Sequence, residues 1–327
     1  MAKVTISDVA QAAGVSKATV SRYLNKHFER MSPNTRQKIA KVIEDLNYQP
    51  SFQASALKSN RTHLVGVVVA DVSNIYSTLL ITGINQVAKD HGNQIMIGDA
   101  SDDLDQQQES IELLLRQNVD GLIIQPMSQN PHAYDYLRKS GTPTVMVDRL
   151  TKPLFWPTVT SDDYDATYKL AQAVLAAGYQ DILIFINEIS AASTRQLRSQ
   201  AFLDATKGKA TVTLLETQND DPQVVAAWLA QHPKVHPVVF AGNGRLLMAL
   251  LLWLKDQGLT CPDDLGVCGY DDWRWAALVG PGISSVTQYP IQIGQQATEL
   301  LVQLIDGAKI PATQVKVAAD LNLRGSF

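Results

Sequence analysis

The chain has 327 residues, 45% of them hydrophobic, which is enough for two or three domains with ordinary apolar cores. Its net charge of -4 excludes a uniformly basic surface of the kind that binds nucleic acid non-specifically. The sequence has no run of about eighteen apolar residues and no apolar stretch at its N-terminus, so we expect a cytoplasmic protein without a membrane span or signal peptide.

The charges are unevenly distributed along the chain. Residues 1–62 contain ten Lys or Arg and four Asp or Glu, a balance of +6, whereas the remainder contains 18 basic and 28 acidic residues, a balance of -10. Charges more than about 10 Å apart are largely screened at cellular ionic strength. The basic N-terminal segment can therefore contact DNA phosphates although the whole chain is acidic.

Two short helices around a tight corner are predicted near the N-terminus. Thr5 is suited to cap a helix over Ile6–Ala13, and Gly14 ends that helix. Ser16 can then cap a second helix, which runs from Lys17 to about Leu24. This spacing is typical of a helix-turn-helix, the motif that places its second helix in the DNA major groove.

A third helix is expected to begin at Pro33, directly after the cap residue Ser32. Its apolar positions fall on one stripe, which would complete a small three-helix core. The stripe consists of Ile39, Val42, Ile43 and Leu46. We therefore expect residues 1–50 to form a DNA-binding domain.

The outward face of the second helix is suited to contact DNA. Lys and Arg can donate to guanine O6 and N7, Ser can contact a base edge or a phosphate, and Ala can touch a thymine methyl group. The residues on that face are Lys17, Ala18, Ser21 and Arg22. We expect further DNA contacts from Thr5, Ser16, Thr19 and Asn25.

The segments "VTISDVAQAAGVSKATVSRYLN" and "LNYQP" resemble the DNA-binding domain of the lactose-repressor (LacI/GalR) family of bacterial transcription regulators. Residues 51–62 would then be the hinge, although Ser51 and Ser55 stand where the family usually has Asn and Arg. The resemblance implies that the hinge becomes a helix on operator DNA. It also implies that Leu57 and its copy in a second subunit open a base step in the minor groove.

From residue 63 onward, short apolar runs alternate with helical segments, a pattern typical of an α/β fold with parallel sheets and helices on both faces. The expected helices are Leu79–His91, Asp105–Gln117, Thr167–Ala177, Thr194–Thr206, Val224–Gln231, Leu246–Gln257 and about Ile291–Asp306.

The family resemblance extends through this region and implies an effector-binding and dimerisation core over residues 63–327. Such cores are similar to periplasmic sugar-binding proteins, with two lobes and a ligand cleft between them. Lobe 1 would cover about 63–160 plus 291–320, and lobe 2 about 161–290. The expected fold is therefore α/β, with a helix-turn-helix head and hinge followed by a two-lobed core that is like a periplasmic binding protein.

The resemblance also implies which side chains meet an effector in the cleft. Carboxylates and amides would bind sugar hydroxyls, Arg a carboxylate, and an aromatic side chain the apolar face of a ring. Gly244 departs from the family pattern, which often has Asp there. The expected effector residues are Asn74, Tyr76, Asp148, Arg195, Arg198, Asn243, Asp271, Trp273 and Gln288.

No catalytic constellation stands out, so we expect no enzymatic activity, no cofactor and no metal. His232 and His236 are four residues apart, but a proline after each favours a surface loop over a metal site. The two cysteines, Cys261 and Cys268, are expected to be free thiols without a function, as in a reducing compartment.

The resemblance implies a homodimeric repressor of carbohydrate-utilisation genes that binds a near-palindromic operator and is released by a sugar or sugar acid. The segment "YDDWRWAALVGPG" is similar to the ketodeoxygluconate-repressor subgroup, which regulates sugar-acid use. The alternatives are a corepressor-dependent repressor, a repressor assisted by a phosphocarrier protein, a sugar-transport protein and an enzyme. The missing export segment and the basic head argue against transport.

Overall fold

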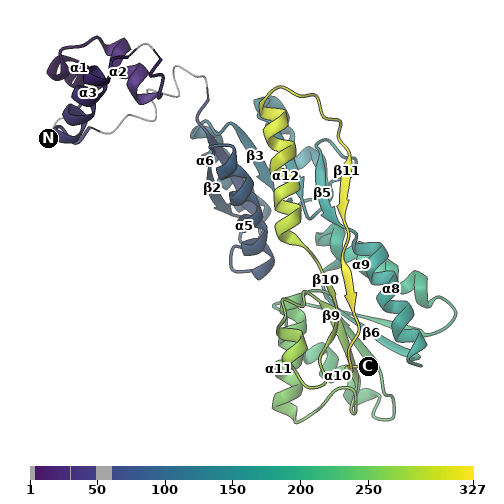
Figure 1. The fold of residues 1–327 in the computed structure, drawn as a ribbon. Helices are drawn as coiled ribbons and strands as arrows, with labels where there is room; N and C mark the ends of the chain where they lie inside the picture. Colours follow the sequence, from purple (N-terminus) through teal and green to yellow (C-terminus); the bar gives the residue numbers. More distant parts are fainter. Residues whose placement is uncertain (1–3, 30, 49–60) are drawn as a thin grey trace. The chain divides into compact units, whose positions relative to one another are not determined.

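A computed structural model describes residues 4–29, 31–48 and 61–327. The chain divides into two compact units, an N-terminal head and a core, with the boundary between His63 and Leu64. Figure 1 shows the helices of the head and the sheets of the core. Within the described residues, no helix has both the length and the apolar character needed to cross a membrane.

The head contains α1 (Ile6–Ala13), α2 (Lys17–Leu24) and α3 (Pro33–Asp45), which confirms the predicted helices. Gly14 ends α1 at a positive φ of 62°, where glycine is favoured because it has no Cβ. The side chain of Ser16 accepts a hydrogen bond from the Thr19 amide at 3.1 Å, as expected of a helix cap. The helices pack around the buried side chains Val9, Ala13, Val20 and Ile39.

Lobe 1 is built on a six-stranded parallel sheet. Helices α5 (Ile75–Asp90) and α12 (Pro290–Ile305) cover one face, while α6 (Leu104–Arg116) and α7 (Asp135–Ser140) cover the other. A Cβ at Gly83 would lie 2.1 Å from the Ile291 carbonyl oxygen, so glycine there allows α5 and α12 to pack closely. In spatial order the strands are β11 (Gln314–Val317), β5 (Thr158–Ser161), β4 (Thr144–Val147), β3 (Gly121–Ile124), β1 (Leu64–Val69) and β2 (Gln94–Asp99).

Lobe 2 repeats this architecture. Helices α8 (Asp163–Ala176) and α9 (Ser193–Thr206) cover one face of its sheet, and α10 (Gln223–Gln231) and α11 (Gly244–Gln257) cover the other. The strands are parallel apart from β12, which is antiparallel to β10. In spatial order they are β12 (Asp320–Asn322), β10 (Ser284–Thr287), β9 (Gly266–Tyr270), β8 (Val238–Ala241), β6 (Asp181–Asn187) and β7 (Thr211–Thr217).

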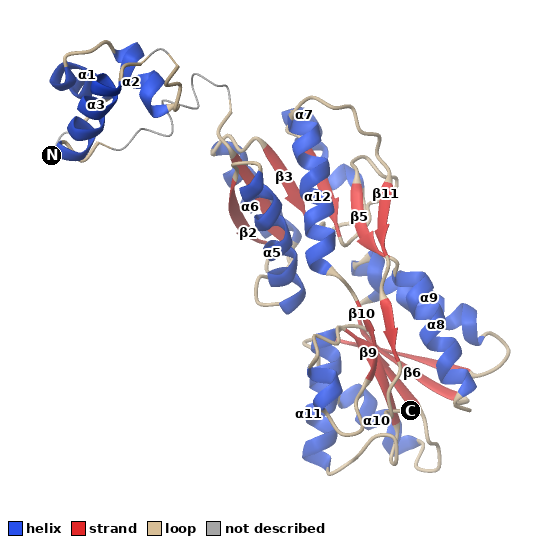
Figure 2. Cartoon of the chain, in the orientation of Figure 1, coloured by secondary structure: helices blue, strands red, loops and turns tan. Residues whose placement is uncertain are grey.

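Three segments connect the lobes, and Figure 2 labels the strands β5, β10 and β11 that precede them. They follow β5, β10 and β11, each of which is joined to an element of the other lobe. Lobe 1 was expected to extend to residue 320, but Asp320 begins β12 in the sheet of lobe 2. The side chain of Ser326 donates to the Val267 carbonyl of β9, so the C-terminal residues pack on lobe 2. Three short 3-10 helices complete the core, at Pro131–Tyr134, Ile189–Ala191 and Trp275–Leu278.

Candidate functional site

A cavity lies between the lobes of the core, at the carboxyl ends of strands from both sheets. Its volume is about 70 Å³, and both lobes contribute side chains to its wall. In α/β sheets this edge is where ligands usually bind. The expected effector residues that line the cavity are Asn74, Tyr76, Asp148, Arg195, Arg198, Asn243, Asp271 and Gln288.

Trp273 is not part of this wall, which corrects the expectation that it would cover a ring of the ligand. It lines a separate cavity of about 500 Å³ together with Tyr289 and Pro290. Its indole packs against the apolar core of lobe 1. The backbone at Trp273 has a φ of 30°, which non-glycine residues rarely adopt and which residue spacing did not predict.

Arg198 lines the cavity and is almost completely buried. Its Nε and Nη2 lie 2.8 and 2.6 Å from Oδ1 of Asp163, and its Nη1 donates to the Gly242 carbonyl at 2.7 Å. The guanidinium also lies 3.6 Å from the centroid of the Tyr270 ring, within the range of a cation–π interaction. Arg198 can still donate hydrogen bonds to a ligand. Because Asp163 balances its charge, however, it attracts an anion less strongly than an unpaired arginine would.

Asp148 and Asp271 present carboxylates to the cavity from the ends of β4 and β9. Both have a positive φ, 66° and 68°, which non-glycine residues rarely adopt and which is often found at functional sites. Nε2 of Gln125 donates to Asp148 Oδ2 at 2.8 Å and holds that carboxylate in place. Burial raises the pKa of Asp271 to about 6, and the charge of Asp148 adds to this effect.

Gly244 determines where Asp271 can lie. Its amide donates to Asp271 Oδ2 at 3.1 Å, and a Cβ at this position would lie 2.8 Å from the Asp271 Cβ. Any larger residue, including the Asp common in the family, would push Asp271 away. The departure from the family pattern at Gly244 is therefore matched to the position of the neighbouring carboxylate.

Two cavity residues are also helix caps. Asn74 Oδ1 accepts from the Tyr76 amide at the start of α5, and Asn243 Oδ1 accepts from the Leu246 amide at the start of α11. Helix N-termini carry partial positive charge, so both α5 and α11 favour electronegative ligand groups in the cavity. Burial and the charge of Asp148 raise the pKa of Tyr76, whose hydroxyl stays protonated and can donate.

Three buried polar atoms at the cavity lack hydrogen-bond partners among the described residues. They are the Tyr76 hydroxyl and two acceptors, Oδ1 of Asp271 and Oε1 of Gln288, and all three residues are almost completely buried. A buried acceptor without a donor costs about 1–3 kcal/mol. Hydroxyl groups of a ligand could supply the missing donors, so the cavity is suited to bind a polyhydroxylated molecule.

Several arginines besides Arg198 line the cavity. Arg195 donates from Nη1 to the Glu188 carbonyl at 3.1 Å. Burial lowers its pKa, and the neighbouring guanidinium groups of Arg149 and Arg245 lower it further. Sequence analysis missed Arg245, as well as Gln125 and Asp163. Ligand contacts in α/β folds often follow the carboxyl ends of parallel strands. This rule could have identified Arg245, because it follows β8.

The expected DNA-contacting residues lie in the head. Lys17, Ala18 and Arg22 are exposed on α2, and Ser21 is half-buried beside them. The other expected contacts, at Thr5, Ser16, Thr19 and Asn25, all have side-chain hydrogen bonds at helix ends or within α2. Leu57 and most of the expected hinge lie outside the described residues.

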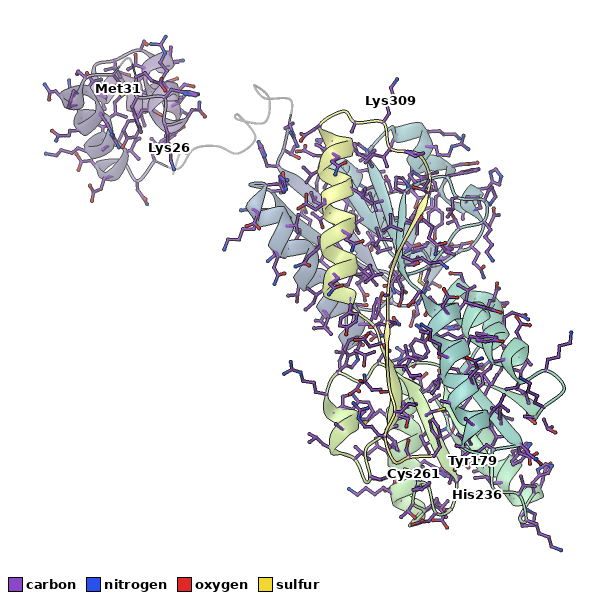
Figure 3. All side chains as sticks on the ribbon, turned by 45° about the vertical axis from the view of Figure 1, so that its right-hand side comes forward. Lys26, Met31, Tyr179, His236, Cys261 and Lys309 are labelled. Atoms are coloured by element: carbon purple, nitrogen blue, oxygen red, sulfur yellow. The ribbon has the colours of Figure 1, made fainter. Side chains whose placement is uncertain are left out.

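The cysteines and histidines of lobe 2 lie away from the cavity. Neither Cys261 nor Cys268 is in a disulfide, and burial raises the pKa of both thiols. Figure 3 shows Cys261, Tyr179 and His236 in lobe 2, where His236 stacks on Tyr179 and lies 2.9 Å from the Pro262 carbonyl oxygen. His232 instead stacks on Trp228, so the two histidines have different partners.

Comparison with known proteins agrees with this division of the chain. A family model described as "Bacterial regulatory proteins, lacI family" matches residues 5–51. A second, described as "Periplasmic binding proteins and sugar binding domain of LacI family", matches residues 62–321.

Individual relatives match over nearly the whole length. The HTH-type transcriptional regulator KdgR of Bacillus subtilis (strain 168) is 32% identical over 330 residues, which cover 99% of this chain and 97% of that protein. The regulator PtxS of Pseudomonas plecoglossicida is 34% identical over 326 residues, or 99% and 96% of the two chains. A structure of the lac repressor dimer bound to operator and the anti-inducer ONPF has a TM-score of 0.85, with 22% identity and 99% of each chain covered.

The helix-turn-helix head, the two-lobed core and both family matches point to the same assignment. The relatives are named as transcriptional regulators, which agrees with the expectation that the chain is not an enzyme. The chain therefore belongs to the LacI family and is a DNA-binding transcriptional regulator.

Proposed function

We propose that this regulator is a cytoplasmic homodimeric repressor of carbohydrate or sugar-acid utilisation genes, released from a near-palindromic operator by an effector in the cleft. The observation that carries the proposal is the pair of buried, unpartnered acceptors of Asp271 and Gln288 in a cavity between two lobes. A ligand that binds both lobes changes their spacing. Effector and operator then weaken each other's binding by the same factor.

We propose a sugar acid as the effector. Asp148, Asp271 and Gln288 would bind its hydroxyls, since carboxylates and amides accept from ligand O–H groups. Its carboxylate would lie among the arginines Arg149, Arg195 and Arg245 that line the cavity. Burial and these neighbours disfavour the positive charge of Arg195, which an anion would stabilise. The similarity of the segment around Trp273 to regulators of sugar-acid use supports the same class.

Thermal-shift screening of the purified protein tests this effector class. A ligand that binds only the native state at 100 times its Kd adds about 2.7 kcal/mol to the free energy of unfolding. For a domain of this size that corresponds to a rise in Tm of roughly 5–10 °C. We expect such a rise with sugar acids and a smaller one with the matching neutral sugars. A rise confined to neutral sugars would contradict the sugar-acid assignment.

We propose that two copies associate through an exposed apolar surface on lobe 2, formed by Met248, Leu252 and Leu278. Leu252 and Leu278 are 55% and 85% exposed, and with Trp275 and Val279 they border a cavity of about 880 Å³. Apolar surfaces of this extent usually mark an interface. A second copy is the occupant that fits, because a near-palindromic operator requires two recognition helices related by twofold symmetry. The lac repressor, which has the same fold, is a dimer on its operator.

The combined variant Leu252→Asp/Leu278→Asp is expected to raise the dimer Kd at least 100-fold, as measured by sedimentation velocity. Charged groups would be buried without partners, and each substitution acts twice in a twofold interface. Leu113→Asp on α6 is the matched control, because Leu113 is also 55% exposed but lies on lobe 1. A double variant that stays dimeric at the wild-type concentration range would place the interface elsewhere.

We also propose that Leu57 inserts into the minor groove together with its copy in the second subunit, as the family resemblance implies. Leu57→Ala should then weaken operator binding and leave effector affinity of the core intact.

A further inference from the structure

Arg245 crosses the cleft between the lobes. It lies in the first turn of α11 in lobe 2, and its side chain is 38% exposed. Its Nη1 lies 2.8 Å from Asp71 Oδ2 and its Nη2 lies 3.6 Å from Asp102 Oδ2, and both of these carboxylates belong to lobe 1. Its Nε lies 3.1 Å from Asp220 Oδ2 within lobe 2. One guanidinium group therefore holds carboxylates from both lobes.

Arg245 lies among positively charged side chains that line the cavity. Both Arg195 and Arg149 line it as well, and the ion pairs of Arg149 with Asp102 and Asp148 are longer, at 3.7 Å. Arg198, the fourth arginine of the cavity, is paired with Asp163. The other three guanidinium groups repel one another unless anions lie between them. In this structure Asp71 and Asp102 of lobe 1 provide those anions.

The bridge formed by Arg245 limits the room for a ligand. A volume of about 70 Å³ holds a few water molecules, whereas small-molecule sites usually have about 300–1,000 Å³. Arg245, Asp71 and Asp102 all line the cavity, so their contacts are part of its wall. A sugar-sized ligand can enter only if the lobes move apart or these contacts break.

We propose that Arg245 is the receptor for the anionic group of the effector, and that this group replaces Asp71 on the guanidinium when the effector binds. Asp71 is thus an internal competitor that holds Arg245 until an external anion arrives. After the exchange, the effector lies between Arg245 and lobe 1 in place of the direct Arg245–Asp71 ion pair. The spacing of the lobes then changes. The inference rests on the proposed effector function and adds the residue that selects acids over neutral sugars.

The proposal predicts opposite effects of two substitutions in the same ion pair. Arg245→Gln should weaken binding of an acidic effector at least ten-fold, because an N⁺–H to carboxylate bond is lost. Asp71→Asn should tighten the same binding by about three-fold or more, because the competing carboxylate is removed while the shape is kept. A merely structural role of the pair would make both variants bind more weakly.

The experiment is isothermal titration of the full-length protein with D-gluconate, with the neutral D-glucitol and with D-glucose 6-phosphate, together with any sugar acid that gives a larger thermal shift. Tighter binding of the phosphate than of every acid would identify a phosphate as the natural anion. Arg116→Gln, which removes one exposed positive charge from α6, is the matched control and should change none of the affinities.

The outcomes separate this inference from the effector proposal. Loss of acid binding in Arg245→Gln, tighter acid binding in Asp71→Asn and unchanged binding of any neutral sugar would support the exchange. If acids bind and Arg245→Gln has no effect, the exchange is wrong and the effector class stands. If neutral sugars alone bind, or no sugar derivative binds, both proposals are wrong.

Discussion

Replacing Arg198 with Met is expected to lower the free energy of unfolding of the core by about 3–5 kcal/mol, because it leaves a buried carboxylate without its partner. Asp163 is only 2% exposed and has both short contacts to the guanidinium. Methionine keeps much of the volume of the arginine side chain, so the loss reports mainly on charge. Urea denaturation followed by circular dichroism measures the change.

A second variant separates charge from packing. In Arg198→Met/Asp163→Asn the buried charge is removed together with its partner, so much of the lost stability should return. Both variants should bind effector more weakly, because Arg198 lines the cavity. A single variant within about 1 kcal/mol of the wild type would mean that the buried pair is solvated or neutral, contrary to its burial.

Replacing Arg22 with Ala is expected to reduce operator affinity about 10- to 100-fold, which corresponds to roughly 1–3 kcal/mol. Arg22 is exposed on α2, the second helix of the helix-turn-helix, and Arg commonly forms bidentate hydrogen bonds with guanine. An operator can be selected from random DNA with the wild-type protein. Fluorescence anisotropy at fixed salt concentration then gives the affinities of both proteins.

The internal control is DNA of unrelated sequence. If Arg22 contacts bases, its loss should reduce binding to the operator far more than binding to unrelated DNA. An equal loss on both would show that Arg22 contacts phosphates alone, and the base-contacting residues would then have to be sought among Lys17, Ala18 and Ser21.

The head could be predicted closely because its structure is determined by local chemistry. The caps Ser16 and Ser32 each bind an amide three residues later, and Gly14 ends a helix by its own φ. These interactions lie within one helical turn, so residue spacing reveals them. The same locality explains why the bounds of α1 and α2 agree with the predicted ones.

The predicted first residues of two core helices lie too far along the chain. Helix α5 begins at Ile75 and not at Leu79, and α8 begins at Asp163 and not at Thr167. The first turn of α5 lies at the cavity, which Tyr76 and Ser77 line, and Asp163 in the first turn of α8 pairs with the cavity residue Arg198. Apolar periodicity, on which the prediction relied, is weakest in such polar turns.

The contacts across the cleft could not be predicted from the residues. Asp71 and Arg245 are 174 positions apart, and the Arg198–Asp163 pair joins two helices of lobe 2. Such pairs depend on how the sheets and helices are placed, and local spacing carries no information about that. The prediction for Trp273 was wrong for a related reason, since proximity in sequence to Asp271 does not determine which side of a turn a side chain occupies.

Three connecting segments join the lobes, and their number limits the kind of movement that a ligand in the cavity can cause. One connection would let the lobes swivel freely, and two would define a hinge line. With three connections, the lobes can bend and twist against each other but cannot easily separate or slide. The core can therefore respond to a ligand in the cavity between the lobes by a change in the angle between them.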